Sequence, residues 1–157
     1  MNERQPIYLT AEGVENLRQE LDHLTNVKRP ALAERLHEAI QQGDLSENAD
    51  YQIAKEEQGF LEGRIQQIEV MLREAVIIQE DASTDEVALG SRVTVVEEGE
   101  EEPETFLIVG AAEADPIGGK VSNESPMGLA LLGRRAGDTV TVQAPGGDIV
   151  FHITVIK

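Results

Sequence analysis

The sequence predicts an α+β protein of two domains, in which a long antiparallel α-helical coiled-coil hairpin is followed by a small antiparallel β-sheet domain with one short helix. Apolar residues recur every three or four positions up to about residue 78, which is the period of a helix. From residue 88 onward, short Val/Ile/Thr runs alternate with Gly and Pro, which is typical of strands and turns. The polar segment between the two patterns is typical of a linker. We therefore expect a hairpin over residues 1–78, a linker over 79–87 and a globular domain over 88–157.

Two apolar seams predict the two helices of the hairpin. The first helix is expected over residues 10–42, which makes it roughly 50 Å long at about 1.5 Å per residue. Pro30 lacks a backbone donor and is expected to kink this helix without ending it. Gly43 is a natural helix stop, and Asp44 or Ser46 is a natural restart. The seam positions are Val14, Leu17, Leu21, Leu24, Leu32, Leu36, Ala39 and Ile40, then Ala54, Leu61, Ile65, Ile68, Leu72 and Ala75.

A hairpin of this length cannot fold back into a compact ball, so segment 43–50 is expected to form an exposed tip. The alternative for such a seam is a dimerisation coiled coil. The short connecting turn favours pairing of the helices within one chain, and we expect a monomer.

The C-terminal half is expected to form strands over residues 92–96, 106–109, 140–144 and 149–155. Residues 145–148, Pro-Gly-Gly-Asp, join the last two as a hairpin. Ser125 is expected to cap a short helix whose first turn holds Pro126 and whose end is Gly133. The Glu-rich run 97–104 is expected to be a solvated loop between two strands.

Composition excludes several function classes. Thirteen Lys and Arg against 30 Asp and Glu give a net charge of −17, which argues against a free-standing nucleic-acid binder. The chain has no Cys, so disulfides, cysteine zinc sites and thiol chemistry are excluded. No apolar run approaches a membrane span and no signal peptide is evident, so we expect a cytoplasmic protein without a membrane partner. No nucleophile arrangement stands out, and the chain taken alone does not look like an enzyme.

The tip is the segment most informative about function. Asp44, Glu47 and Asp50 place three carboxylates within seven residues, and carboxylates can hold a hard cation such as Mg²⁺. Asp44 and Glu47 could therefore supply half of a metal site to a partner. The same spacing also fits a capping box, with Asp44 as the N-cap and Glu47 as the third residue of the helix. On spacing alone, the capping box is favoured over the metal site. A calcium loop is rejected, because Ala49 and Lys55 replace its turn glycine and its bidentate Glu.

The chain resembles the GreA/GreB family of bacterial transcript cleavage factors, and its GreA branch more than GreB. The resemblance covers nearly the whole chain, and its most specific parts are the tip and the start of the second helix. The motifs are Tyr8-Leu9-Thr10, Arg29-Pro30, residues 43–51 (Gly-Asp-Leu-Ser-Glu-Asn-Ala-Asp-Tyr), Gln58-Gly59-Phe60, Glu62-Gly63-Arg64-Ile65, Ser125-Pro126, Leu131-Leu132-Gly133 and Pro145-Gly146-Gly147.

The resemblance implies a C-terminal domain similar in fold to FK506-binding proteins, docked by the loop of Glu124, Ser125 and Pro126 at the secondary channel of RNA polymerase. It implies that the coiled coil enters this channel and that Asp44 and Glu47 help hold the polymerase's second Mg²⁺. The polymerase would then cleave the 3′ part of a backtracked nascent RNA, with this chain as an accessory factor that binds no cofactor alone. An inhibitor that enters the same channel and a prolyl isomerase are the alternatives.

Overall fold

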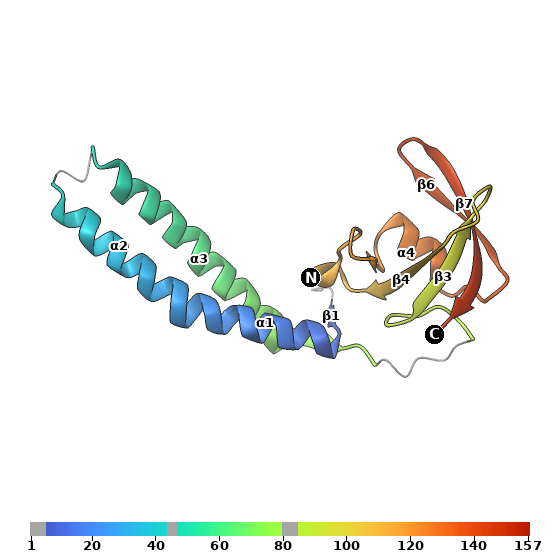
Figure 1. Ribbon diagram of the computed structural model, residues 1–157. Coiled ribbons are helices and arrows are strands. Elements are labelled where there is room, and N and C mark those ends of the chain that lie inside the picture. Colours follow the sequence, from blue (N-terminus) through green and yellow to red (C-terminus); the bar gives the residue numbers. More distant parts are fainter. Residues whose placement is uncertain (1–5, 44–46, 80–84) are drawn as a thin grey trace, which may run out of the picture. The chain divides into compact units, whose positions relative to one another are not determined.

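The computed structural model describes residues 6–43, 47–79 and 85–157 (Figure 1). Contacts between Cα atoms divide the chain into two units, one formed by Val14–Glu74 and the other by Met1–Gly13 together with Ala75–Lys157. This division differs from the one expected from the sequence, because both ends of the predicted hairpin group with the sheet domain. Each unit is described by itself below.

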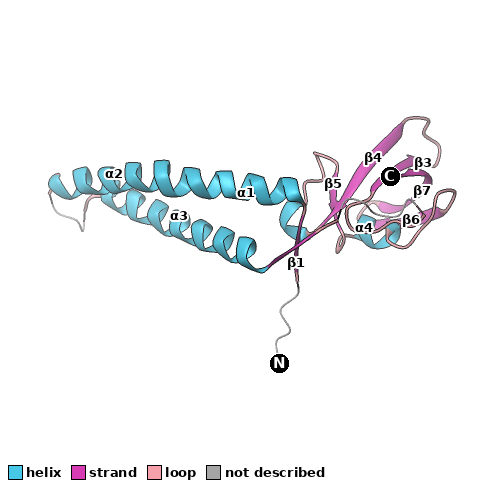
Figure 2. Cartoon of the chain, turned by 90° about the horizontal axis from the view of Figure 1, so that it is seen from below, coloured by secondary structure: helices cyan, strands magenta, loops and turns pink. Residues whose placement is uncertain are grey.

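The first unit is the predicted helical hairpin. Its first arm comprises α1 (Ala11–His23), the π-helical segment η1 (Leu24–Lys28) and α2 (Arg29–Gln41), and its second arm is α3 (Ala49–Glu74). Helices α2 and α3 lie side by side in Figures 1 and 2. The apolar seams therefore pair within one chain, as the short turn between them predicts.

A π-helical turn lies just before Pro30, where a kink that does not end the helix is expected. The backbone N–H of Arg29 donates to the carbonyl of Leu24, five residues earlier. In a regular α-helix the Pro30 ring would clash with the carbonyl of Asn26, and Pro30 has no N–H to donate to it. The wider turn over η1 accommodates both conditions, and the arm continues without ending.

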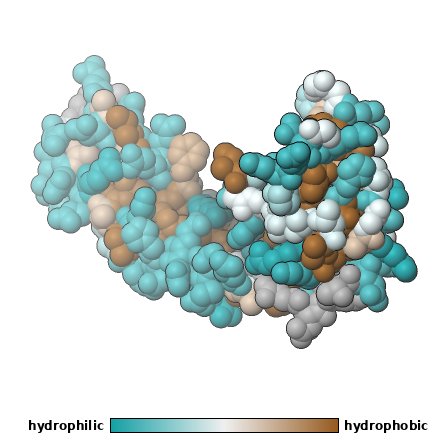
Figure 3. Space-filling view, turned by 45° about the vertical axis from the view of Figure 1, so that its right-hand side comes forward, coloured by the Kyte–Doolittle hydropathy of each residue, from teal (hydrophilic) through white to brown (hydrophobic). Residues whose placement is uncertain are grey.

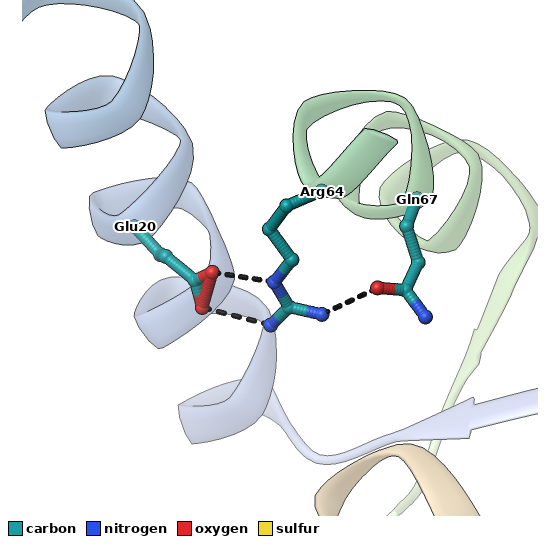
Figure 4. Close-up of polar contacts among 3 residues, drawn as sticks. All are labelled: Glu20, Arg64 and Gln67. Carbon is teal, nitrogen blue, oxygen red and sulfur yellow. Dashed lines mark hydrogen bonds and ion pairs between the residues drawn. The ribbon is translucent and has the colours of Figure 1, made fainter. Parts of the chain in front are cut away.

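Ion pairs between the arms surround the apolar core of the hairpin. The guanidinium of Arg64 holds the Glu20 carboxylate through two hydrogen bonds of 2.7 and 2.8 Å and donates a third, of 2.8 Å, to Gln67 (Figure 4). The hydrogen bonds from Arg64 lower the pKa of Glu20. Further cross-arm pairs join Arg29 to Glu62 at 2.8 Å and Arg35 to Glu57 at 2.6 Å. The core itself contains Leu32, Leu36, Ala54, Ile65, Ile68 and Met71.

The second unit contains a five-stranded sheet in the described part of the chain, with strand order β5-β4-β3-β7-β6 (Figure 2). The prediction of an antiparallel sheet is wrong at one edge, because β5 pairs with β4 in parallel and makes the sheet mixed. The turn predicted over 145–148 is present but is limited to Pro145-Gly146, and the acidic loop predicted over 97–104 is present and exposed but is limited to 98–102, because the strands extend further than expected. The strands are β3 (Arg92–Glu97), β4 (Pro103–Val109), β5 (Lys120–Ser122), β6 (Thr139–Ala144) and β7 (Gly147–Ile156), and the short helix is α4 (Pro126–Leu131).

A parallel pair of three-residue strands, β1 (Ile7–Leu9) and β2 (Ala75–Ile77), also belongs to this unit, and the sequence did not predict it. Directly after β1, the N–H and hydroxyl of Thr10 donate to the two carboxylate oxygens of Glu113, each at 2.6 Å. The Thr10 hydroxyl in turn accepts from the N–H of Gly13 at 3.0 Å. Glu113 therefore holds the capping residue of α1 from a position 103 residues away.

Candidate functional site

The first side of the tip is the end of α2. The N–H of Gln42 donates to the Ala39 carbonyl at 3.2 Å, and Gly43 follows with a φ of 121°. A positive φ is readily adopted only by glycine, so Gly43 ends the helix as predicted.

The second side of the tip is set by Asn48, which the sequence analysis did not single out. Its Oδ1 accepts from the N–H of Tyr51 at 3.1 Å, which makes Asn48 the N-cap of α3. Its Nδ2 donates to the carbonyl of Ala39 at 2.6 Å. One side chain therefore satisfies a free donor of α3 and a terminal carbonyl of α2, and it ties the two arms together at the tip.

The capping-box prediction for Glu47 is wrong. Helix α3 begins at Ala49, so Glu47 precedes the cap and cannot be its third helical residue. Asp44, the other member of the predicted box, lies outside the described residues. Glu47 is exposed and makes no hydrogen bond or ion pair with a residue that the structure describes. Its carboxylate is thus not used to hold the described part of the tip.

The described part of the tip carries polar side chains around a shallow hollow. A shallow hollow of about 350 Å³ is lined by Gln42, Glu47, Asn48, Ala49 and Asp50. Within residues 6–43, 47–79 and 85–157, no group of three or more His, Cys, Asp or Glu side chains is placed to hold a metal ion. The described residues therefore form no complete metal site, and Glu47 presents an exposed carboxylate at the edge of the hollow.

The second predicted site, the loop of Glu124, Ser125 and Pro126, lies between β5 and α4. The Ser125 hydroxyl caps α4 by accepting from the N–H of Gly128 at 3.1 Å, as predicted, and it donates to the Ser122 carbonyl at 2.7 Å. Gly128 is buried against this carbonyl, and a Cβ there would collide with it. Ser125 thus shapes the loop, while the side chains of Glu124 and Pro126 are exposed.

The described part of the tip belongs to the unit Val14–Glu74, and the loop of Glu124, Ser125 and Pro126 belongs to the unit that contains Ala75–Lys157. The sequence did carry a signal for Asn48, since Asn is among the strongest N-cap residues and stands directly before an uninterrupted helical segment. Among the residues that the structure describes, no helix is long and apolar enough to cross a bilayer.

Comparison with known proteins identifies the family. The family model described as "Transcription elongation factor, N-terminal" matches residues 7–77, and the model "Transcription elongation factor, GreA/GreB, C-term" matches residues 82–157. Transcription elongation factor GreA of Geobacillus kaustophilus is 53% identical over 95% of each chain, and that of Limosilactobacillus fermentum is 49% identical over 100% of each. A solved structure of GreA factor homolog 1 of Thermus thermophilus is 31% identical, covers 98% of this chain and 99% of its own, and has a TM-score of 0.45. The chain belongs to the GreA/GreB family of transcription elongation factors.

Proposed function

We propose that this elongation factor binds RNA polymerase, inserts its helical hairpin into the secondary channel and stimulates the polymerase's own cleavage of backtracked nascent RNA. Rescue of arrested complexes would follow, because cleavage creates a new RNA 3′ end in the active centre. In this proposal the chain is an accessory factor rather than an enzyme. It acts as a monomer in the cytoplasm, where its partner works.

The observation that carries the proposal is the position of Glu47 outside the capped helix. Asn48 already satisfies the N-terminus of α3, and the Glu47 carboxylate is exposed with no described partner. A carboxylate kept free at the end of a helical hairpin is suited to contribute to a site that another molecule completes. Asp44, three residues earlier, is the second carboxylate that we assign to this role.

The donor chemistry at the tip fits Mg²⁺. This ion favours carboxylate oxygens and commonly takes only one or two of them from a protein, with water and phosphate oxygens completing its shell. Asp44 and Glu47 would hold the ion jointly with the polymerase, and the ion would supply a polarised water and charge stabilisation for phosphodiester hydrolysis. The task of this chain is then to carry two negative charges to the polymerase active centre.

Docking is assigned to the loop of Glu124, Ser125 and Pro126. Because Ser125 is occupied as the cap of α4, Glu124 and Pro126 are the side chains left to meet the polymerase. Pro126→Asp in the full chain places a charge on this surface while Ser125 still caps the helix. We expect it to compete poorly with the unmodified chain for polymerase and to keep the same melting temperature. Equal competition would remove the loop from the interface.

A transcript-cleavage assay on stalled elongation complexes tests the proposal as a whole. The proposed factor shortens the RNA from its 3′ end, and the rate rises with factor concentration. A chain that enters the channel only to block it would instead slow both elongation and intrinsic cleavage. A prolyl isomerase would leave the RNA unchanged and accelerate isomerisation of a proline peptide. This alternative is disfavoured, because from residue 85 onward the sequence has only Phe106 and Phe151 as aromatic residues to line an isomerase pocket.

A further inference from the structure

A second surface of the hairpin remains without a role, a groove of about 680 Å³ beside the π-helical segment. Leu24, Val27 and Leu32 line it from the first arm, and Phe60 and Leu61 line it from α3. The hairpin, at the left of Figure 3, shows apolar side chains among polar ones on its surface. The groove lies wholly within the unit Val14–Glu74.

The apolar side chains of the groove are presented to solvent rather than packed away. Phe60 is 71% exposed and Val27 is 55% exposed. The π-helical turn explains the opening, because its wider spacing shifts the apolar positions relative to the seam that continues into α2. Exposed aromatic side chains that are held on a regular helix, beside a hollow, are typical of contact sites for other proteins.

Residues around Phe60 leave room for a partner to approach. Gly59 and Gly63 are exposed in the middle of α3, and a Cβ at either would meet nothing within 4 Å. Glycine weakens a helix, and neither residue is required by packing in the described part of this hairpin. The absence of side chains on both sides of Phe60 leaves its ring accessible.

The charged residues at the edge of the groove, Lys28, Arg35 and Glu57, form its rim and indicate the chemistry of the partner that would bind there. Arg35 and Glu57 pair with each other across the groove at 2.6 Å, whereas the Lys28 ammonium forms no ion pair with a described residue. The rim is therefore positive in a chain whose net charge is −17. An apolar side chain with a carboxylate near it complements this rim. A second copy of this chain is a poor occupant, because two chains that each carry a net charge of −17 repel each other. A nucleic acid is also a poor occupant, because a single ammonium is too little to hold its phosphate backbone.

We propose that this groove is a second docking surface for RNA polymerase, which inserts an apolar side chain against Phe60 and Val27 and places a carboxylate at Lys28. The identity of the partner rests on the proposed function. The groove acts through affinity, whereas the tip carboxylates act on the cleavage step. The two roles are therefore separable by experiment.

Two substitutions test the groove, each with a matched control. Phe60→Ala removes the exposed ring, and Ile53→Ala removes an apolar side chain that is 51% exposed on the same helix but does not line the groove. Lys28→Glu reverses the rim charge, and Lys55→Glu makes the same change on α3, away from the groove. We expect both groove variants to bind polymerase about tenfold more weakly than the unmodified chain. Both controls should bind normally.

Cleavage kinetics and crosslinking complete the test. At saturating concentration the groove variants should stimulate cleavage at the full rate. A variant that lacks the Glu47 charge should remain defective at every concentration. A photoreactive benzophenone residue at position 60 should crosslink to a polymerase subunit. Normal binding by either groove variant overturns the proposal, as does crosslinking to RNA, or a dimer of the unmodified chain in sedimentation that Phe60→Ala dissociates. If the groove variants bind weakly but the unmodified chain stimulates no cleavage, the groove stands and the proposed function fails.

Discussion

The side-chain amide of Asn48 donates a 2.6 Å hydrogen bond to the carbonyl of Ala39, so the residue that caps the start of α3 also binds the end of α2. The same side chain accepts from the N–H of Tyr51 at 3.1 Å. Buried and partly buried terminal groups of a helix need such partners, and here one residue serves both helices. The arrangement fixes the described part of the tip without using the carboxylate of Glu47.

Substitution of Asn48 separates these two roles. Asn48→Asp keeps an acceptor for the Tyr51 N–H but loses the donor to Ala39, and we expect it to cost about 1 kcal/mol of hairpin stability. Asn48→Ala loses both bonds and is expected to cost about 2 kcal/mol. Amide hydrogen exchange at Tyr51 reports the cap directly. Protection should persist in the Asp variant and fall in the Ala variant, and equal protection in both would show that Asn48 is not the cap.

Two glycines in helices predict opposite effects of the same substitution. Gly13 lies in the first turn of α1, where a Cβ would collide with the Glu113 carboxylate that holds Thr10. Gly13→Ala should therefore destabilise the protein by about 1–3 kcal/mol, although Ala is the better helix former. Gly59→Ala meets open space and should stabilise the hairpin by up to about 1 kcal/mol. Thermal unfolding of the two variants checks the signs, and a stabilising Gly13→Ala would contradict the contact with Glu113.

The ion pair of Glu20 and Arg64 predicts a dependence of stability on pH. Hydrogen bonding to Arg64 lowers the pKa of Glu20 below its ordinary value of 4.5. The unfolded chain thus binds the proton more readily than the folded chain, so the pair stabilises the fold fully above about pH 4.5, and this contribution is lost as pH falls through the lowered pKa. Both side chains are more than one third exposed, so we expect a coupling energy of only about 0.5–1 kcal/mol.

A double-mutant cycle with Glu20→Gln and Arg64→Met, followed by urea unfolding, measures this coupling. It should be present at pH 7 and should decrease as the pH is lowered through the lowered pKa of Glu20. A coupling energy that stays constant at every pH at which the protein remains folded, down to acid unfolding, would show that the charge of Glu20 does not stabilise the hairpin.

Periodicity predicted the elements that depend on local pattern. The two helical arms, the strands β3, β4, β6 and β7, the Ser125 cap and the Pro145-Gly146 turn are each encoded within a short window of sequence. The strands that the sequence did not reveal, β1, β2 and β5, are three residues long. Such strands are defined by their partners, and Tyr8 pairs with Val76, which is far away along the chain. No local sequence pattern predicts this pairing.

The candidate site was predicted only in part, because its cap also depends on contacts between distant segments. Asp44, Ser46 and Asn48 are all good N-cap residues within five positions, and propensity alone does not choose among them. Asn48 is selected by its second bond to Ala39, which depends on how the arms meet. Likewise, nothing in the sequence around Glu113 distinguishes it as the partner of Thr10.

The central claim is that Asp44 and Glu47 act through negative charge at the polymerase active centre. Stimulated transcript cleavage with Asp44→Asn and Glu47→Gln at limiting Mg²⁺ tests this most directly, because both substitutions keep the shape and one oxygen atom of the side chain and remove its negative charge. We expect polymerase binding and melting temperature to be unchanged, cleavage to fall at least about tenfold, and added Mg²⁺ or Mn²⁺ to restore part of it. Cleavage close to that of the unmodified chain at limiting Mg²⁺ would contradict the account.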